Sequence, residues 1–208
     1  MNWYFIHPAL MRYLTDSEAW TQPEQAATHG LSSLIFRPVQ ANDVDLILEM
    51  HQRLSAETIY NRYLSPRLPT RQEIARLCEL GEANGRVLVA VVAGKRTAVV
   101  GLAYYIVSEA HVAETALLVE DRYQGQGLGK QLLHQLACLA LVQGIYYFDA
   151  LVLPSNKPML HLLHHVGLVI QNRLDYGTRE MRVQLTAVPP STPFEAQKPQ
   201  EAIALPAR

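Results

Sequence analysis

The segment at residues 124–130 constrains this chain more than any other, because it reads Gln-Gly-Gln-Gly-Leu-Gly-Lys. It follows an apolar run at 115–119 and opens an amphipathic pattern that predicts a helix over 127–143. Three glycines leave little side-chain bulk, so a ligand can approach the bare backbone. Backbone N–H groups at the start of a helix also attract phosphate oxygens. The segment therefore predicts a pyrophosphate-binding turn between a strand and a helix.

Two common phosphate-binding motifs do not fit this segment. A nucleotide-triphosphate P-loop needs Gly, four residues and then Gly-Lys-Ser/Thr. Here Gln124 stands five positions before Gly129, and Lys130 is followed by Gln131. A dinucleotide-binding fold needs G-x-G-x-x-G after its first strand, whereas this chain has G-x-G-x-G after several strand-like segments. An ordinary glycine-rich turn before a helix stays open as the alternative.

Composition excludes several classes of function. The 208 residues suffice for one domain of roughly 150 residues with extensions. A formal net charge of −1 gives no electrostatic signal for nucleic acid or an anionic membrane. Cys78 and Cys138 both fall in predicted helices, which favours buried thiols over a disulfide. Because the sequence shows neither a signal peptide nor a long apolar stretch, we expect a cytoplasmic protein with no nucleic-acid or membrane partner.

The order of predicted elements indicates an α/β domain at 33–186. An N-terminal arm or linker is expected at 1–32, and a Pro/Ala-rich, poorly ordered tail at 187–208. Apolar periodicity, caps and turn residues predict strands at 33–39, 87–93, 98–107, 112–119, 145–153, 168–172 and 179–185. They predict helices at 42–54, 55–64, 70–81, 127–143 and 156–167. Thr70 and Glu73 have the spacing of a capping box.

The glycine-rich turn resembles a known family signature. Gln124, Gly127 and Gly129 fill the pattern Q/R-x-x-G-x-G/A, and from about residue 33 to 185 the chain resembles the GNAT superfamily of acyl-CoA-dependent N-acyltransferases. The resemblance implies an α/β fold with a mixed central sheet, helices on both faces, and splayed fourth and fifth strands. By position these strands are 112–119 and 145–153.

In that family, acetyl-CoA places its pantetheine arm in the opening between the two strands. The resemblance puts the thioester carbonyl near the backbone of Leu118, which would act as an oxyanion hole. A second landmark begins at Asn156, which either binds the cofactor or simply caps a helix; the two roles are compatible. The cofactor-binding residues implied by the resemblance are Leu117, Leu118, Val119, Gln124, Gly125, Gln126, Gly127, Leu128, Gly129, Lys130 and Asn156.

The resemblance also implies a general base at Glu114, near the start of the fourth strand. A carboxylate among apolar strand residues is costly unless it is used or paired, and burial would raise its pKa toward the range useful for a base. The alternative is a strand-end carboxylate that faces solvent or pairs with an arginine. Many relatives carry a tyrosine general acid where this chain has Leu163. His161 and His165 have metal-ligand spacing, but no third ligand is evident and no metal is expected.

A narrower resemblance concerns residues 54–63, Leu-Ser-Ala-Glu-Thr-Ile-Tyr-Asn-Arg-Tyr. They are similar to a segment of bacterial Pat-type protein lysine acetyltransferases, which implies substrate contacts for Tyr60, Arg62 and Tyr63. The alternative makes the tyrosines core residues and places Arg62 in a salt bridge.

We therefore expect acetyl transfer from acetyl-CoA to a primary amine, with a protein lysine as first choice, reached through a shallow groove. A small-amine acetyltransferase, for a polyamine or aminoglycoside-like acceptor, and a non-catalytic acyl-CoA sensor stay open. The sequence also leaves open whether the protein forms a homodimer.

Overall fold

The computed structural model describes residues 34–81, 83–92 and 97–186. The expected arm at 1–32 and tail at 187–208 lie outside these ranges. Within them, the strands form one mixed sheet in the order β1-β2-β3-β4-β5-β7-β6. The strands are β1 (Leu34–Pro38), β2 (Gly85–Val92), β3 (Ala98–Glu109), β4 (Val112–Val119), β5 (Tyr147–Val152), β6 (Gly167–Asp175) and β7 (Thr178–Leu185). Every neighbouring pair is antiparallel except β4 and β5.

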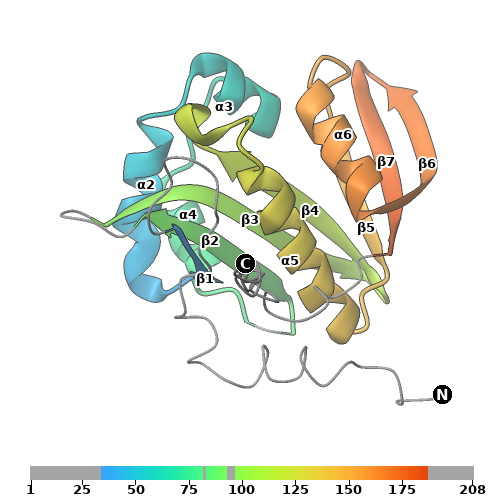
Figure 1. Ribbon diagram of the computed structural model, residues 1–208, viewed down its shortest axis with the longest axis horizontal. Coiled ribbons are helices and arrows are strands. Elements are labelled where there is room, and N and C mark those ends of the chain that lie inside the picture. Colours follow the sequence, from blue (N-terminus) through green and yellow to red (C-terminus); the bar gives the residue numbers. More distant parts are fainter. Residues whose placement is uncertain (1–33, 82, 93–96, 187–208) are drawn as a thin grey trace, which may run out of the picture.

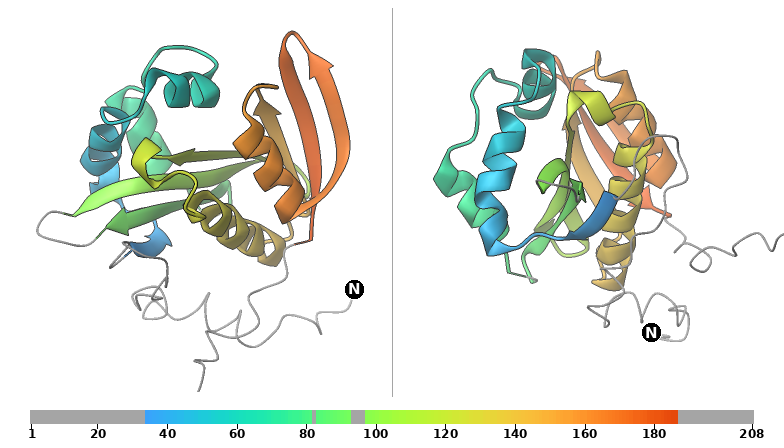
Figure 2. Two further views of the ribbon diagram at one scale, coloured as in Figure 1. Left: turned by 45° about the horizontal axis from the view of Figure 1, so that its top comes forward. Right: turned by 60° about the vertical axis from the view of Figure 1, so that its left-hand side comes forward.

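Helices cover both faces of the sheet, as Figures 1 and 2 show. The helical segments are η1 (Ala41–Asp43), α2 (Val44–His51), α3 (Ala56–Tyr63), α4 (Arg71–Cys78), η2 (Asp121–Tyr123), α5 (Leu128–Val142) and α6 (Lys157–Val166). On one face α5 and α6 bury one apolar cluster, which includes Leu132, Leu136 and Leu163. On the other face α2 and α4 bury a second, which includes Ile47 and Ile74. The expected α/β architecture is confirmed.

The expected start of the first helix is displaced by a few residues. Asn42 lies within η1, and α2 begins at Val44. The carboxylate of Asp43 accepts hydrogen bonds from the Arg37 guanidinium at 2.6 and 2.7 Å and from the Gln40 amide at 2.7 Å. Because Asp43 is buried and ties β1 to the helix start, it organises this end, and Asn42 does not.

The capping box expected before α4 is present. The Thr70 hydroxyl accepts from the Glu73 amide at 3.3 Å, and the Glu73 carboxylate accepts from the Thr70 amide at 2.7 Å. These bonds satisfy donors that a helix N-terminus leaves unpaired. The helix ends at Cys78, three residues before Gly81, where the sequence pattern placed its end.

The parallel strands β4 and β5 separate partway along their length. Their register joins Val112 to Tyr147, Ala113 to Phe148 and Glu114 to Asp149, and stops there. Strand β4 continues to Val119 while still pairing with β3 on its other side. The expected splay therefore begins directly after Glu114, which leaves the β5-facing edge of β4 open.

Neither cysteine forms a disulfide: Cys138 is buried and Cys78 is partly buried. Burial raises the pKa of each thiol to about 11. Among the helices of the described ranges, none combines the length and apolar character needed to cross a bilayer.

Candidate functional site

The glycine-rich turn connects β4 to α5 through two left-handed backbone positions. Gly125 has φ of +71° and Gly127 has φ of +85°, and a side chain at either would meet open space. These two glycines are therefore required by backbone conformation rather than by crowding. A Cβ at Gly129 would instead come within 3.3 Å of the side chains of Leu117 and Leu162. The start of α5 is thus packed closely against its neighbours, while its first-turn N–H groups point away from the helix body.

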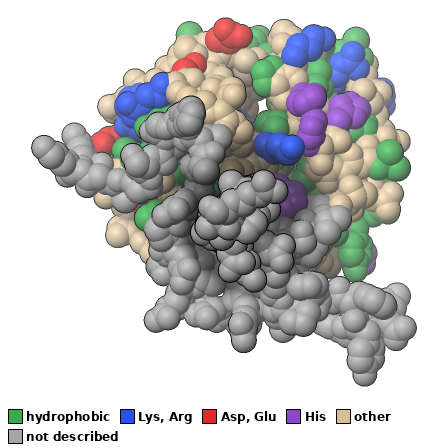
Figure 3. Space-filling view, in the orientation of Figure 1, with side chains coloured by type: hydrophobic (Ala, Val, Ile, Leu, Met, Phe, Trp, Pro, Cys, Tyr) green, Lys and Arg blue, Asp and Glu red, His purple; other side chains and the backbone are tan. Residues whose placement is uncertain are grey.

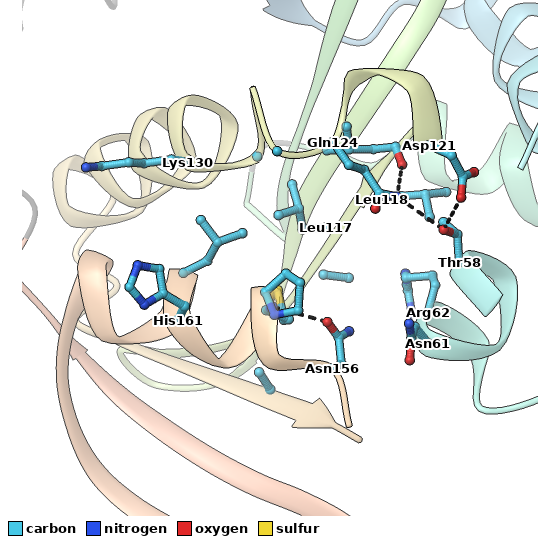
Figure 4. Close-up of a pocket in the computed structure, with 18 of the residues that line it drawn as sticks. Thr58, Asn61, Arg62, Leu117, Leu118, Asp121, Gln124, Lys130, Asn156 and His161 are labelled. Carbon is cyan, nitrogen blue, oxygen red and sulfur yellow. Dashed lines mark hydrogen bonds between the residues drawn. The ribbon is translucent and has the colours of Figure 1, made fainter. Parts of the chain in front are cut away.

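A cavity of about 610 Å³ opens beside this turn. Its walls come from β4, β5, the turn, the start of α6 and α3, and Figure 4 shows many of the lining residues. The expected cofactor residues that line it are Leu117, Leu118, Val119, Gln124, Gly125, Gly127, Gly129, Lys130 and Asn156. Gln126 does not, because its side chain donates to the Arg122 carbonyl at 2.7 Å. Leu128, the first residue of α5, is buried in the core.

Four side chains, which we call the α3 brace, tie α3 to the glycine-rich turn: Ser55, Thr58, Asp121 and Gln124. Asp121 accepts hydrogen bonds from the Ser55 hydroxyl at 2.5 Å, the Ser55 amide at 2.9 Å and the Thr58 hydroxyl at 2.8 Å. Gln124 donates to the Thr58 hydroxyl at 3.1 Å and to the Val119 carbonyl at 2.9 Å. Figure 4 shows Thr58, Asp121 and Gln124 with the hydrogen bonds that join them.

The electrostatics of Asp121 follow from the same contacts. Burial alone would raise the pKa of its carboxyl, but the hydrogen bonds from Ser55 and Thr58 outweigh that and hold the pKa below its usual value. Sequence reasoning missed the brace. The one available signal was the Ser-x-x-Thr spacing in residues 54–63, which also makes Ser55 the N-cap of α3.

Asn156 caps α6, which is one of the two roles expected from the sequence; the other is cofactor binding. Its side-chain oxygen accepts from the Met159 amide at 3.1 Å, and Pro158 occupies the first turn. The Asn156 NH₂ group has no hydrogen-bond partner among the described residues and lies in the cavity wall. The capping role therefore leaves a donor for a ligand.

A second cavity, of about 580 Å³, adjoins the first. The residues that line both are Arg62, Thr115, Ala116, Ala150 and Leu151. The two cavities therefore meet where β4 and β5 separate. Asp149 and Arg182 form a two-point ion pair in the second cavity, with both nitrogen–oxygen distances at 2.7 Å.

Glu114 lies in the second cavity, not in the protein interior. Its side chain is exposed, so the expectation of a buried carboxylate is wrong. The reason is the splay: Glu114 is the last β4 residue paired with β5, at the edge of the opening. No described residue forms an ion pair with it.

Arg62 is held between two aromatic rings at the junction of the cavities. Its guanidinium carbon lies 4.9 Å from the Tyr63 ring centroid and 5.2 Å from that of Tyr104, and it donates a hydrogen bond to the Tyr104 hydroxyl. No described carboxylate pairs with it, so the alternative of a salt bridge is not seen. Tyr63 lines the second cavity, whereas Tyr60 is exposed and lines neither.

Tyr63 is anchored in turn by a buried histidine. His51 Nδ1 lies 2.7 Å from the Ile47 carbonyl, which can only accept, so Nδ1 carries the proton. The Tyr63 hydroxyl therefore donates to His51 Nε2, at 2.6 Å. Burial lowers the pKa of His51, which keeps the ring neutral, and raises the pKa of Tyr63 to about 12.

The structure also defines the surroundings of Leu163 and of the two histidines of α6, His161 and His165. Leu163 is 0% exposed and packs in the core, so no general acid stands at that point of α6. His161 and His165 line the first cavity with ring centroids 4.2 Å apart, and Figure 3 shows histidine side chains gathered over α6. Within the described ranges, no three His, Cys, Asp or Glu residues lie close enough to hold a metal.

Comparison with known proteins agrees with this geometry. The relative "Acetyltransferase Pat" of Mycolicibacterium smegmatis is 36% identical over 164 residues, which cover 77% of this chain and 48% of the relative. The chain thus spans about half the length of that relative.

Two solved structures share the fold. The GNAT domain of S. lividans PAT matches with a TM-score of 0.65 at 24% identity, covering 74% of this chain and 92% of that one. The putative acetyltransferase YncA of Salmonella typhimurium, solved with acetyl-CoA, matches with a TM-score of 0.60 at 21% identity, covering 77% and 100%. The model of the acetyltransferase (GNAT) family matches residues 50–168, more than half of the sequence. The chain belongs to the acetyltransferase (GNAT) family.

Proposed function

We propose that this protein transfers the acetyl group of acetyl-CoA to the ε-amine of a lysine on another protein. The observation that carries the proposal is the junction of the two cavities at the β4–β5 fork. One cavity holds the glycine-rich turn, and the other holds Glu114. Donor and acceptor can therefore approach the same short stretch of β4, at Thr115 and Ala116, from two sides.

The donor side suits acetyl-CoA. Its pyrophosphate would bind the N–H groups at the start of α5, where the helix dipole favours anions. Beyond Glu114 the β5-facing edge of β4 lacks a strand partner, and unpaired backbone groups favour a ligand that hydrogen-bonds to them. The pantetheine arm can make those bonds. The thioester oxygen would meet the Leu117 amide and not that of Leu118, the residue expected from the resemblance. The Glu120 N–H bonds to the Val100 carbonyl of β3, and the unbroken β3–β4 pairing turns every second amide, including that of Leu118, toward β3.

The acceptor side needs a base, and Glu114 is placed to supply it. A lysine ammonium has an ordinary pKa near 10.4, so only about one in 2,500 is neutral at pH 7. Glu114 accepts one proton from the ammonium, and the freed amine attacks the thioester carbonyl. The tetrahedral intermediate breaks its C–S bond and releases the CoA thiolate, and its nitrogen gives its second proton to the thiolate or to water, which leaves the neutral amide. A thiol with a pKa near 8.5 leaves without full protonation, which accounts for a leucine at position 163.

Three observations favour a protein lysine as the acceptor. Residues 54–63 resemble the Pat-type segment, and the 36% identical relative is named Acetyltransferase Pat. The second cavity also has an open rim, formed in part by the exposed side chains of Ile106 and Leu151. A protein surface can reach such a site. A small polyamine is the second candidate, favoured by the carboxylates of Glu114 and Glu180 in the same cavity.

The test is an acceptor screen with purified protein and acetyl-CoA. CoA release and mass spectrometry would be followed over lysine peptides, folded proteins and a panel of small amines. We expect acetyl-lysine on peptide or protein acceptors. Selective acetylation of a polyamine would assign the second candidate instead. Binding of acetyl-CoA with no acetylated product from any acceptor would indicate a sensor.

A further inference from the structure

We propose that Arg62 binds a carboxylate of the acceptor, so that the preferred lysine has an aspartate or glutamate close to it in the sequence or on the surface. This inference rests on the proposed function and specifies its acceptor. It follows from three properties of Arg62: its position is fixed, its charge is not paired, and it faces a cavity whose other free charges are negative.

The position of Arg62 is fixed by neutral groups. The rings of Tyr63 and Tyr104 lie against the guanidinium, and the Tyr104 hydroxyl accepts one of its five N–H donors. The Tyr63 hydroxyl is held by His51 at 2.6 Å. A guanidinium that is already ordered loses little conformational entropy when a ligand binds.

The charge of Arg62 has no counter-ion in the described part of the chain. The other arginine of the second cavity, Arg182, is paired with Asp149 through two hydrogen bonds. Glu114 and Glu180 line the same cavity and form no ion pair with a described residue. The cavity therefore presents one available cation, from α3, and two available carboxylates, from β4 and β7. This distribution matches an acceptor that carries both an ammonium and an anion.

The donor does not supply that anion. The phosphates of acetyl-CoA are expected at the start of α5, and Figure 4 shows Lys130 of α5 and Arg62 of α3 on opposite sides of the first cavity. The acetyl thioester, which must reach the junction, is neutral. A carboxylate that meets Arg62 therefore comes from the acceptor, and a planar guanidinium can bind it through two parallel hydrogen bonds.

Matched peptides test the inference in the wild-type protein. Each capped peptide carries one lysine and one aspartate, moved through positions −3 to +3, and each has a partner with asparagine in place of aspartate. We expect kcat/KM at the best position to be at least tenfold higher for aspartate than for asparagine, and the ratio to fall as salt rises. A ratio near one at every position would overturn the inference while leaving lysine acetylation intact.

Variants then assign the preference to Arg62. Arg62→Gln should reduce the aspartate-to-asparagine ratio to near one, and Arg62→Lys should give an intermediate ratio, because it keeps the charge but loses the two-point geometry. Arg173→Gln is the matched control, since Arg173 is exposed and lines neither cavity. An Arg62→Gln protein that keeps the wild-type ratio would refute the assignment. If no lysine peptide is acetylated although acetyl-CoA binds, the proposed function fails, and this inference fails with it.

Discussion

Two glutamates six residues apart are expected to respond differently to the same substitution, one through stability and the other through turnover. Glu120, directly after β4, is 3% exposed and accepts from Arg53 Nε at 3.0 Å and from Arg122 Nε at 2.5 Å. Glu114, near the start of β4, is exposed and has no described ion-pair partner. Glu120→Gln should therefore lower stability, and Glu114→Gln should lower turnover.

The size of each effect follows from the contacts. Breaking a buried ion pair costs about 3–5 kcal/mol. Glutamine keeps one acceptor oxygen, and the Arg53 and Arg122 side chains are 31% and 60% exposed, so water can solvate them. We therefore expect about 2–3 kcal/mol for Glu120→Gln, a fall in Tm of about 4–12 °C. Loss of a positioned general base typically costs 10²–10⁴-fold, so Glu114→Gln should reduce kcat about 10²-fold or more at pH 7.

Thermal unfolding and steady-state kinetics on both variants, with and without acetyl-CoA, measure the two effects. The kinetic defect of Glu114→Gln should shrink as pH rises, since more of the lysine is then neutral. Its Tm should stay within about 1–2 °C of wild type, because exposed substitutions usually change stability by less than about 0.5 kcal/mol. A Glu114→Gln protein with wild-type turnover at pH 7 would assign the base to another group. An unchanged Tm for Glu120→Gln would refute the structural role of that carboxylate.

Three further predictions concern the turn, the brace and the anchor of Arg62. Acetyl-CoA at 100 times its Kd should stabilise wild type by about 2.7 kcal/mol. Gly129→Glu should abolish the resulting thermal shift, because its Cβ crowds Leu117 and Leu162 and its charge repels phosphate. The pKa of Asp121 is lowered in the folded state, so its contribution to stability is full above the usual value of 3.8 and lost as pH falls through the folded value. In urea titrations the free energy of unfolding of wild type should exceed that of Asp121→Asn by under about 1 kcal/mol, because the group is exposed. This difference should disappear once the pH falls below the pKa of Asp121 in the folded state. Tyr63→Phe should cost about 1–3 kcal/mol in chemical denaturation because it leaves buried His51 Nε2 without a donor, whereas the matched Tyr60→Phe should cost little.

Local patterns predicted most of the fold because its elements are locally specified. The capping box at Thr70 and Glu73 and the turn at residues 124–130 each depend on residues within a few positions of one another. Alternation and apolar runs located the strands to within a few residues. The β4–β5 fork came from family resemblance, because nothing in the residues of a strand records where its pairing with a neighbour stops.

The sequence could not place groups whose partners are distant in the chain. The hydrogen bonds from Ser55 to Asp121 span 66 residues, and no local pattern connects the two. The exposure of Glu114 was misjudged for a related reason. A charged residue in an apolar strand suggests burial, but this one stands where β5 turns away and opens a cavity. The ion pair of Asp149 with Arg182, which leaves Arg62 as the available cation, also requires the β5–β7 register.

The resemblance in residues 54–63 gains a physical meaning from these contacts. Helix α3 has only eight residues, too few to be stable alone in water. At its start, Ser55 and Thr58 bond to Asp121, and Gln124 bonds to Thr58. At its end, Tyr63 is held by His51. The residues that make the segment similar to its relatives thus hold α3 between the glycine-rich turn and the second cavity.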